Sequence, residues 1–411
     1  MKIPGTHKIA YVEKIKLRAC DLRPGMYVCE LDCPWLDTPF FLQGFEITSD
    51  ADIEAVMQHC EHVYIDVHRT RLIMANFGAG RANAKSNKQK PAFDRKELQA
   101  SASAHKQTTQ LFKSFADEIR FGHAPKLHIA KAAVAECVAV VMANPTATLL
   151  MARLRDKDEY TSQHAFSVCI YSIILGRELG YDIAQLENLG MCGLLHDVGK
   201  LEIADAILNK PGKLTPEESA IMQGHTLLGR DILMSGRDVF SGAVDVACGH
   251  HENLDGSGYP RGLHENQIST NCKIVAVVDK YDALTTHRPY RPGQDHLSAV
   301  SVLNKLAKEN KIDRQLKASF ITYLGVYPPG SVVELNSGEI AIVIGAEPAH
   351  RLEPQLLVVR DPDRNPIQRF VDLRDYSKHS SGRPCRIIAV RSAEDFGLDV
   401  GEYYDLIAQA V

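Results

Sequence analysis

The feature that most constrains this chain is a histidine–aspartate doublet, His196-Asp197, at the end of an apolar helical run. Lys200 follows shortly after it, and a second histidine pair, His250-His251, comes about fifty residues later. The apolar residues before the doublet would pack into a core, so its two polar side chains would turn toward a cavity. The sequence therefore predicts a helical core built around a polar pocket.

Three further candidate ligands lie in the same region: His164, His225 and Asp279. With the two histidine motifs they make five imidazoles and two carboxylates within about 115 residues. Such a set suits two hard or borderline divalent metals that share one carboxylate. A single histidine here would more often be a core residue, but several on helices of one apolar domain indicate a metal site.

Composition and charge exclude several functional classes. A chain of 411 residues suits two or three domains, and its net charge of −4 argues against bulk binding to nucleic acid or to a membrane surface. The ten cysteines form no CxxC pair, which predicts reduced thiols in a cytoplasmic protein. No signal peptide or apolar stretch of membrane length appears, so we expect no membrane span.

The chain divides into segments by hydrophobic pattern. Residues 1–75 alternate short strand-like runs with turns and one helical run, which predicts a small α+β module. Residues 76–105 are poor in large apolar side chains and are interpreted as a flexible linker, and 106–144 as connecting helices. Residues 145–323 show helix after helix, and 324–411 change to a period of two, which predicts a small β appendage with a tail.

The predicted fold class is thus multi-domain. An all-α helical bundle forms the core, with the small α+β module before it and the β appendage after it. A helix start is marked at Thr215, where a capping threonine, Pro216 and Glu218 stand at the favoured positions, and this helix is expected to carry His225. Ligands that come from different helices are typical of a metal site in a bundle core.

Three motifs together resemble the HD-GYP family, a branch of the HD phosphohydrolase superfamily. They are HDVGK at 196–200, HHENLDGSGYP at 250–260 and DKYDALTTHRPYR at 279–291. The likeness covers roughly residues 145–323, and the module around Leu22 resembles a domain of unknown function often found ahead of such domains. The resemblance implies an HD-type bundle in a bacterial metal-dependent phosphodiesterase that hydrolyses the second messenger cyclic di-GMP.

The resemblance also implies how the metals are held. One metal would be bound by His164, His196, Asp197 and Asp279. The second would share Asp197 and be bound by His225, His250 and His251. Iron or manganese is the family's usual metal, with nickel, cobalt and zinc as alternatives, and the metals would activate a bridging hydroxide for in-line attack on phosphorus.

Substrate-binding residues follow from the same resemblance. Lys200 would bind the phosphate beside the metals and act in catalysis, Arg288 and Arg291 would bind the ligand's phosphates, and Tyr259 would line the pocket. The loop from Gly256 to Pro260 would also contact GGDEF-domain (diguanylate cyclase) partners.

One position departs from the family pattern. Members that hold three metals have a glutamate four residues before the first histidine, where this chain has Tyr160, a residue that could instead contact substrate. A two-metal centre is therefore expected, with linear pGpG as the main product and GMP minor or slow. A cyclic di-GMP receptor with little turnover, or a hydrolase of another cyclic dinucleotide, remains the alternative.

Overall fold

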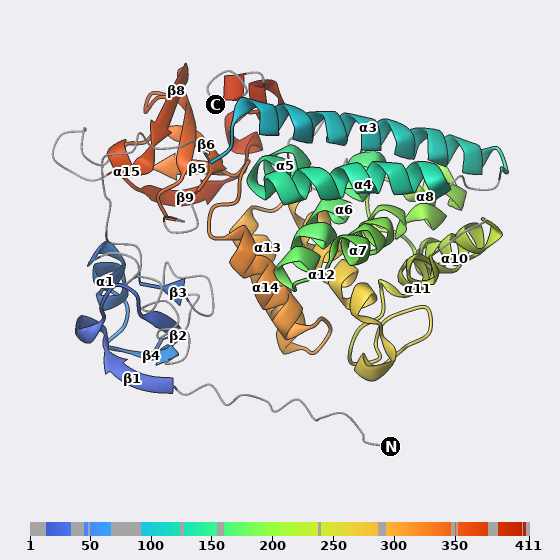
Figure 1. Ribbon diagram of the computed structural model, residues 1–411, viewed down its shortest axis with the longest axis horizontal. Coiled ribbons are helices and arrows are strands. Elements are labelled where there is room, and N and C mark those ends of the chain that lie inside the picture. Colours follow the sequence, from blue (N-terminus) through green and yellow to red (C-terminus); the bar gives the residue numbers. More distant parts are fainter. Residues whose placement is uncertain are drawn as a thin grey trace. The chain divides into compact units, whose positions relative to one another are not determined.

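The computed structural model describes residues 14–33, 45–47, 50–66, 92–123, 127–153, 160–236, 240–286, 293–346, 350, 352–376, 385–404 and 406–407. The chain forms two compact units, Met1–Lys90 and Pro91–Val411 (Figure 1). Within the described residues, none of the helices combines the length and the apolar character needed to cross a bilayer.

The N-terminal unit is a small antiparallel sheet with one helix against it. Its strands run in the order β1-β4-β2-β3, and a core of Val28, Val56 and Val63 is fully buried between the sheet and the helix. The elements are β1 (Lys14–Arg18), β2 (Tyr27–Leu31), β3 (Phe45–Glu46), α1 (Asp50–Met57) and β4 (His62–Asp66). The strands and the helix agree with the predicted α+β module.

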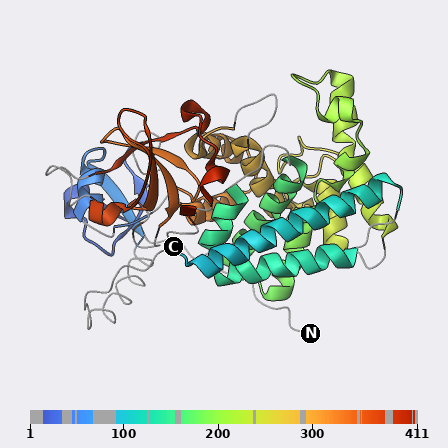
Figure 2. The same cartoon turned by 90° about the horizontal axis from the view of Figure 1, so that it is seen from above.

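The second unit is mainly a helical bundle, and α6 is buried on nearly all sides at its centre. Figure 2 shows the long helices α3 and α4 lying side by side across it. The helices are α3 (Arg95–Arg120), α4 (Leu127–Ala143), α5 (Pro145–Arg153), α6 (Tyr160–Glu178), α7 (Ile183–Leu195), α8 (Asp205–Leu208), α9 (Pro216–Gln223), α10 (His225–Ser235), α11 (Ser241–Gly249), α12 (Thr270–Thr285), α13 (His296–Lys308) and α14 (Arg314–Leu324).

The linker predicted for residues 76–105 is wrong over its last part. Helix α3 begins at Arg95, after a capping box in which Asp94 and Glu97 satisfy each other's backbone N–H groups. Its buried face carries small and polar residues, and Ser101 hydrogen-bonds Thr148 at 3.1 Å. Small side chains let α3 pack closely against the bundle, so a count of large apolar residues missed the helix. Residues 76–91 lie outside the described residues.

The C-terminal strands form a five-stranded antiparallel sheet in the order β8-β7-β6-β5-β9, as the period of two predicted. The strands are β5 (Val332–Leu335), β6 (Ile340–Gly345), β7 (Gln355–Arg360), β8 (Pro366–Asp372) and β9 (Ile387–Arg391), and the one-turn helix α15 (Leu373–Tyr376) follows β8. Ile342 and Leu357 on one face share a buried core with Leu98 of α3 and Leu150 of α5. The sheet is therefore packed into the bundle along that face.

Candidate metal centre

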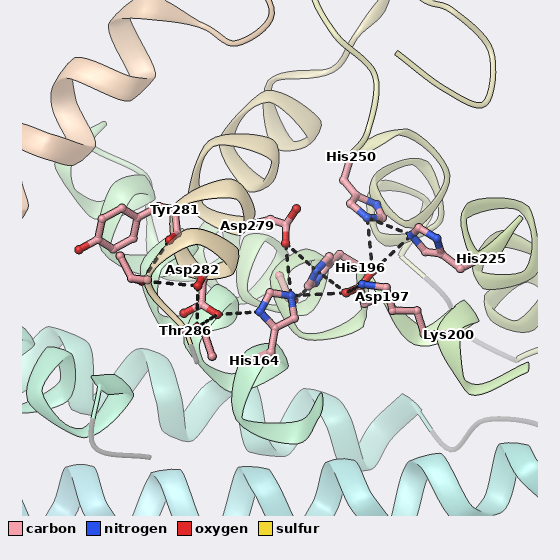
Figure 3. Close-up of polar contacts among 12 residues, drawn as sticks. His164, His196, Asp197, Lys200, His225, His250, Asp279, Tyr281, Asp282 and Thr286 are labelled. Atoms are coloured by element: carbon pink, nitrogen blue, oxygen red, sulfur yellow. Dashed lines mark hydrogen bonds and ion pairs between the residues drawn. The ribbon is translucent and has the colours of Figure 1, made fainter. Parts of the chain in front are cut away.

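The predicted ligands come together between the helices α6, α7, α10, α11 and α12. Figure 3 labels six of the seven, all except His251. His164 lies on α6 and Asp279 on α12, and both are buried. His196 ends α7 and Asp197 follows it directly, while His225 is the first residue of α10. Helix ends are suited to this role because their side chains can point past the helix into the space between elements.

The histidine pair His250-His251 lies at the end of a fifth helix. His250 caps α11 and His251 follows it. The sequence predicted that the helix starting at Thr215 would carry His225. The capping box at Thr215 is present, but α9 ends at Gln223 and a new helix begins at His225, because Gly224 separates the two.

Gly199 sets the spacing between the doublet and α10. A β-carbon at this position would lie 1.9 Å from the carbonyl oxygen of His225 and 2.4 Å from the amide nitrogen of Gly229. The short 3₁₀ helix η3 (Val198–Glu202) therefore touches the backbone of α10 directly. This contact holds Asp197 beside His225.

Asp197 lies at the centre of the site, and its two carboxylate oxygens face different histidines. Oδ1 lies 3.3 Å from Nε2 of His225 and 3.5 Å from Nε2 of His250. Oδ2 lies 3.4 Å from Nε2 of His164 and 3.3 Å from Nε2 of His196. Ligands on neighbouring corners of an octahedral site lie about 3 Å apart, so both sets of distances are close to those of a common metal ion.

The site thus has two halves that meet at Asp197. The histidine–carboxylate half consists of His164, His196 and Asp279, and the three-histidine half of His225, His250 and His251. The ligand atoms of His164, His196 and Asp279 all lie within 4.8 Å of one another. The ligand atoms of the three-histidine half and of Asp197 also lie within 4.8 Å of one another. In the first half, Asp279 Oδ1 lies 3.3 Å from Nε2 of His164 and 3.6 Å from that of His196.

Hydrogen bonds on the far side of the rings orient the imidazoles. The Nδ1 groups of His196, His225 and His250 donate to backbone carbonyls of the preceding turn, at 2.8, 2.7 and 3.0 Å. A carbonyl accepts only, so the proton of each neutral ring is on Nδ1, which leaves the lone pair of Nε2 for the centre. His164 differs, because its Nδ1 lies 2.7 Å from Oδ2 of Asp282, a carboxylate partner typical of metal-binding histidines.

Asp282 was not predicted from the sequence. It is fully buried, and the hydroxyl of Thr286 lies 2.6 Å from its backbone carbonyl oxygen and 3.1 Å from Oδ2, the carboxylate oxygen that faces His164. A signal was present, since Asp282 follows Asp279 by three residues and therefore lies on the same face of α12. Nothing local in the sequence, however, indicated that this carboxylate would orient a histidine.

The electrostatics of the two halves are different. Burial lowers the pKa of His225 to about 4, so this ring is neutral. Burial also acts to lower the pKa of His196, but the charges of Asp197 and Asp279 outweigh it and raise that pKa to about 9. The pKa values of both aspartates lie well below the usual range despite their burial, because cationic and hydrogen-bonding neighbours stabilise the ionised carboxylates. The histidine–carboxylate half therefore attracts positive charge strongly.

The buried atoms fit a metal centre. Among the described residues, neither Nε2 of His196 nor Oδ1 of Asp197 has a hydrogen-bond partner. Buried polar atoms without partners are costly, and here they belong to a set of imidazole nitrogens and carboxylate oxygens that point to a common centre. Imidazole and carboxylate are ligands for divalent iron, manganese, cobalt, nickel and zinc. The donor set therefore suits two divalent cations.

Lys200 lies at the edge of this centre. Its ammonium forms an ion pair with Oδ2 of Asp197, three residues earlier, and its side chain keeps 23% of its surface exposed. A partly exposed cation next to a buried carboxylate is accessible to an anion that enters from solvent.

The glycine-rich loop after His251 borders the three-histidine half. The ring of Tyr259 lies 4.8 Å from that of His251. The buried carboxylate of Glu252 accepts backbone hydrogen bonds from Arg261 and Leu263 at 2.7 and 2.9 Å, which ties the two ends of the loop together. At Gly258 a β-carbon would lie 2.2 Å from a backbone nitrogen, so only glycine fits there.

Three predicted site residues cannot be placed. Arg288 and Arg291 lie outside the described residues, and so does the side chain of Tyr160, the first residue of α6. Their roles stay predictions. The seven predicted ligands all lie in the one site described above.

Comparison with known proteins defines first the class of protein. Residues 148–316 match the family described as HD domain, and residues 14–130 match a domain of unknown function, DUF3391. The second match includes the N-terminal sheet and α3. The HD-domain match covers the helices that carry the ligands. The protein therefore belongs to the class of metal-dependent phosphohydrolases.

Individual relatives then give the family, and one of them matches over most of the chain. The chain is 34% identical over 396 residues, 92% of each chain, to the cyclic di-GMP phosphodiesterase PA4108 of Pseudomonas aeruginosa. It is 42% identical over 136 residues to the cyclic di-GMP phosphodiesterase of Thermotoga maritima, 33% of this chain and 37% of the relative. A Vibrio cholerae 3′3′-cGAMP-specific phosphodiesterase 1 is 37% identical over 171 residues, 41% and 39% of the two chains. The chain belongs to the HD-GYP family of phosphodiesterases.

Proposed function

We propose that this protein hydrolyses cyclic di-GMP to linear pGpG at a two-metal centre. The observation that carries the proposal is the position of Asp197, whose two oxygens each lie 3.3–3.5 Å from a different pair of imidazole nitrogens. The substrate is inferred from the activity for which the Pseudomonas aeruginosa relative, matched over 92% of the chain, is named.

Seven side chains would hold the metals, divided as in the two halves with Asp197 shared. Two divalent cations, iron or manganese, would supply Lewis-acid activation of water and of a phosphoryl oxygen. Asp282 would keep the ring of His164 in one orientation, and the backbone carbonyls would do the same for His196, His225 and His250. A rigid ligand set needs little rearrangement during the reaction.

Lys200 would bind a phosphate oxygen of the substrate. Its ammonium is already beside Asp197 and is partly exposed, so an entering phosphodiester would meet it at the edge of the centre. Tyr259, next to His251, would line the pocket, and Arg288 and Arg291 would bind the second phosphate. The loop at 256–260, with Ser257 exposed, is the proposed contact for GGDEF-domain partners.

The product follows from Tyr160. This residue begins α6 four positions before His164, one helical turn earlier. A phenol with an unperturbed pKa near 10 is a poor ligand for a divalent cation, so the centre should hold two metals and release pGpG with little further cleavage.

The test combines metal analysis with product identification on anaerobically purified full-length protein. We expect two metals per chain and accumulation of pGpG. The variant Tyr160→Glu should raise the metal content toward three and the share of GMP, while Tyr160→Phe should behave like the wild type. Three metals in the wild type, or GMP as the immediate main product, would contradict the proposal.

A second candidate substrate is 3′3′-cGAMP, because three relatives that match 32–41% of the chain carry that specificity in their names. Both ligands are cyclic dinucleotides and differ in one base. Initial rates with the two ligands under identical metal loading distinguish them. Tight binding of cyclic di-GMP with negligible turnover of either ligand would instead indicate a receptor.

A further inference from the structure

The N-terminal unit contains two cysteines whose sulfur atoms are in contact. Sγ of Cys33 lies 3.1 Å from Sγ of Cys60. Cys33 follows strand β2, and Cys60 lies in the turn between α1 and β4. The two residues are 27 positions apart, so nothing in the local sequence brings them together. The fold of the N-terminal unit brings the two cysteines together.

The backbone around this pair is fixed by hydrogen bonds. β2 pairs with β4, with Leu31 opposite Val63. Beyond the end of this pairing, Asp32 accepts hydrogen bonds from the amides of Glu61 and His62 at 3.1 and 2.6 Å, and its own amide donates to the carbonyl of His62 at 3.3 Å. The residues next to each cysteine are thus tied to one another, so the closeness of the sulfurs follows from the sheet.

The geometry favours a disulfide over a metal site. Two thiolates on one tetrahedral zinc, each about 2.3 Å from the metal, lie about 3.8 Å apart. The observed 3.1 Å is shorter than that, and a disulfide requires only a further approach to about 2.05 Å. The third group nearby is the carboxylate of Asp32, and its Oδ2 already accepts two backbone hydrogen bonds.

The two thiols have the accessibility that a stepwise oxidation needs. Cys33 is partly exposed and can meet a reagent from solvent, whereas Cys60 is buried behind it. Burial raises the pKa of Cys60 to about 12, with the contact to Cys33 acting in the same direction, so the Cys60 thiol does not react with solvent reagents by itself. In the helical unit, Cys169 and Cys192 are fully buried, and their pKa values are also raised.

We propose that Cys33 and Cys60 form a reversible disulfide by exchange with a low-molecular-weight disulfide such as oxidised glutathione. Cys33 loses its proton to solvent and attacks one sulfur of the reagent, and one glutathione thiolate leaves. Cys60 then loses its proton and attacks the Cys33 sulfur, and the second glutathione thiolate leaves. Two electrons pass from the cysteines to the reagent, and the two glutathione thiolates take up the two protons that the cysteines lose, which gives two reduced glutathione molecules.

The bond would close a loop that contains β3 and α1. Cross-linking stabilises a fold mainly by restricting its unfolded chain. The oxidised N-terminal unit should therefore unfold at a higher temperature than the reduced one.

The experiment treats full-length protein in the Cys20→Ser background, which removes an exposed thiol, with oxidised glutathione. Remaining thiols are alkylated and the peptides are mapped by mass spectrometry. We expect the loss of two thiols per chain, one cross-linked peptide containing Cys33 and Cys60, and full reversal by dithiothreitol. Cys29→Ser, a change at a partly exposed cysteine on β2, serves as the matched control and should give the same cross-link.

The single variants test the order of the steps. Cys60→Ser should retain one glutathione on Cys33, whereas Cys33→Ser should lose no thiol at position 60. Cys60→Ala replaces Cys60→Ser if the serine variant does not fold. Full alkylation of both cysteines after oxidation, or cross-links to other cysteines, would overturn the proposal. So would a zinc ion in the purified protein that is lost in Cys33→Ser while the helical site keeps its metals.

Discussion

The two halves of the candidate metal centre share Asp197 but are built differently. The histidine–carboxylate half has a second carboxylate, Asp279, and its His164 is oriented by Asp282. The three-histidine half has neutral imidazoles, and backbone carbonyls orient His225 and His250. The first half therefore has two more acidic groups in and around it than the second.

This difference predicts an order of metal affinity. Carboxylates attract divalent cations, and a carboxylate that accepts a hydrogen bond from a ligating histidine raises the basicity of that ring. The histidine–carboxylate half should bind its metal more tightly. Stepwise chelation should accordingly remove first the metal of the three-histidine half.

The largest effect is expected for Asp197→Ala, which removes the group common to both halves. Both metals should be lost, and activity should fall by about 10³-fold or more. Elemental analysis measures the metal content, and circular dichroism checks that the variant is still folded, as we expect. Two metals per chain in a folded Asp197→Ala protein would show that the halves do not depend on this carboxylate.

A smaller effect that separates the halves is expected for His251→Ala. This ligand belongs to the three-histidine half alone, so the metal content should fall from two to one per chain and activity by about 10²-fold. Asp279→Ala is the counterpart in the other half. If the two variants lost metals in the same proportion at every metal concentration, the predicted difference in affinity would be wrong.

The orienting carboxylate should have a weaker influence. Asp282→Asn keeps the size of the side chain but removes its charge, and should reduce metal affinity in the histidine–carboxylate half by about 10–100-fold. Activity should return at saturating metal. Thr286→Val, which removes only the hydroxyl that supports Asp282, should give a smaller loss in the same direction. A loss of the other metal instead would contradict this assignment.

Per pH unit, the smallest expected effect on metal affinity comes from proton release. In the metal-free protein the pKa of His196 is raised to about 9, so this ring is protonated at pH 7 and must lose its proton to bind metal. Metal affinity of the histidine–carboxylate half should therefore rise about tenfold per pH unit until about pH 9. The pKa of His225 is lowered to about 4, so metal binding to the three-histidine half should be almost independent of pH above 5. Calorimetry in buffers of different ionisation enthalpy measures both.

The sequence was sufficient to predict the helices and strands whose signals lie within a short stretch of the chain. The capping box at Thr215 and the change to a period of two after residue 328 both correspond to observed elements. The first turns of α3 were missed because residues such as Ser101 and Ala104 are buried through close helix packing, and small side chains are also typical of linkers.

The metal ligands of the candidate site could be predicted where the histidines and aspartates of a motif themselves indicate metal binding. Five of the seven ligands stand in the three motifs, and His164 and His225 were named as further histidines of the same helical region; the helices bring all seven together. Asp282 was missed because its role depends on the ring of His164, which comes from a different helix. The contact between Cys33 and Cys60 depends on strand pairing in the same way, and sequence spacing carries no sign of it.

Gly199 has a consequence for judging other sequences of this kind. Since a single methyl group there would overlap the backbone of α10, alanine at this position would push apart the two helix ends that carry His196 and His225. A degenerate copy of such a gene could retain every ligand and still encode an inactive protein. In a survey of such sequences, a substituted glycine between the doublet and the lysine is therefore as strong a mark of lost turnover as a missing histidine.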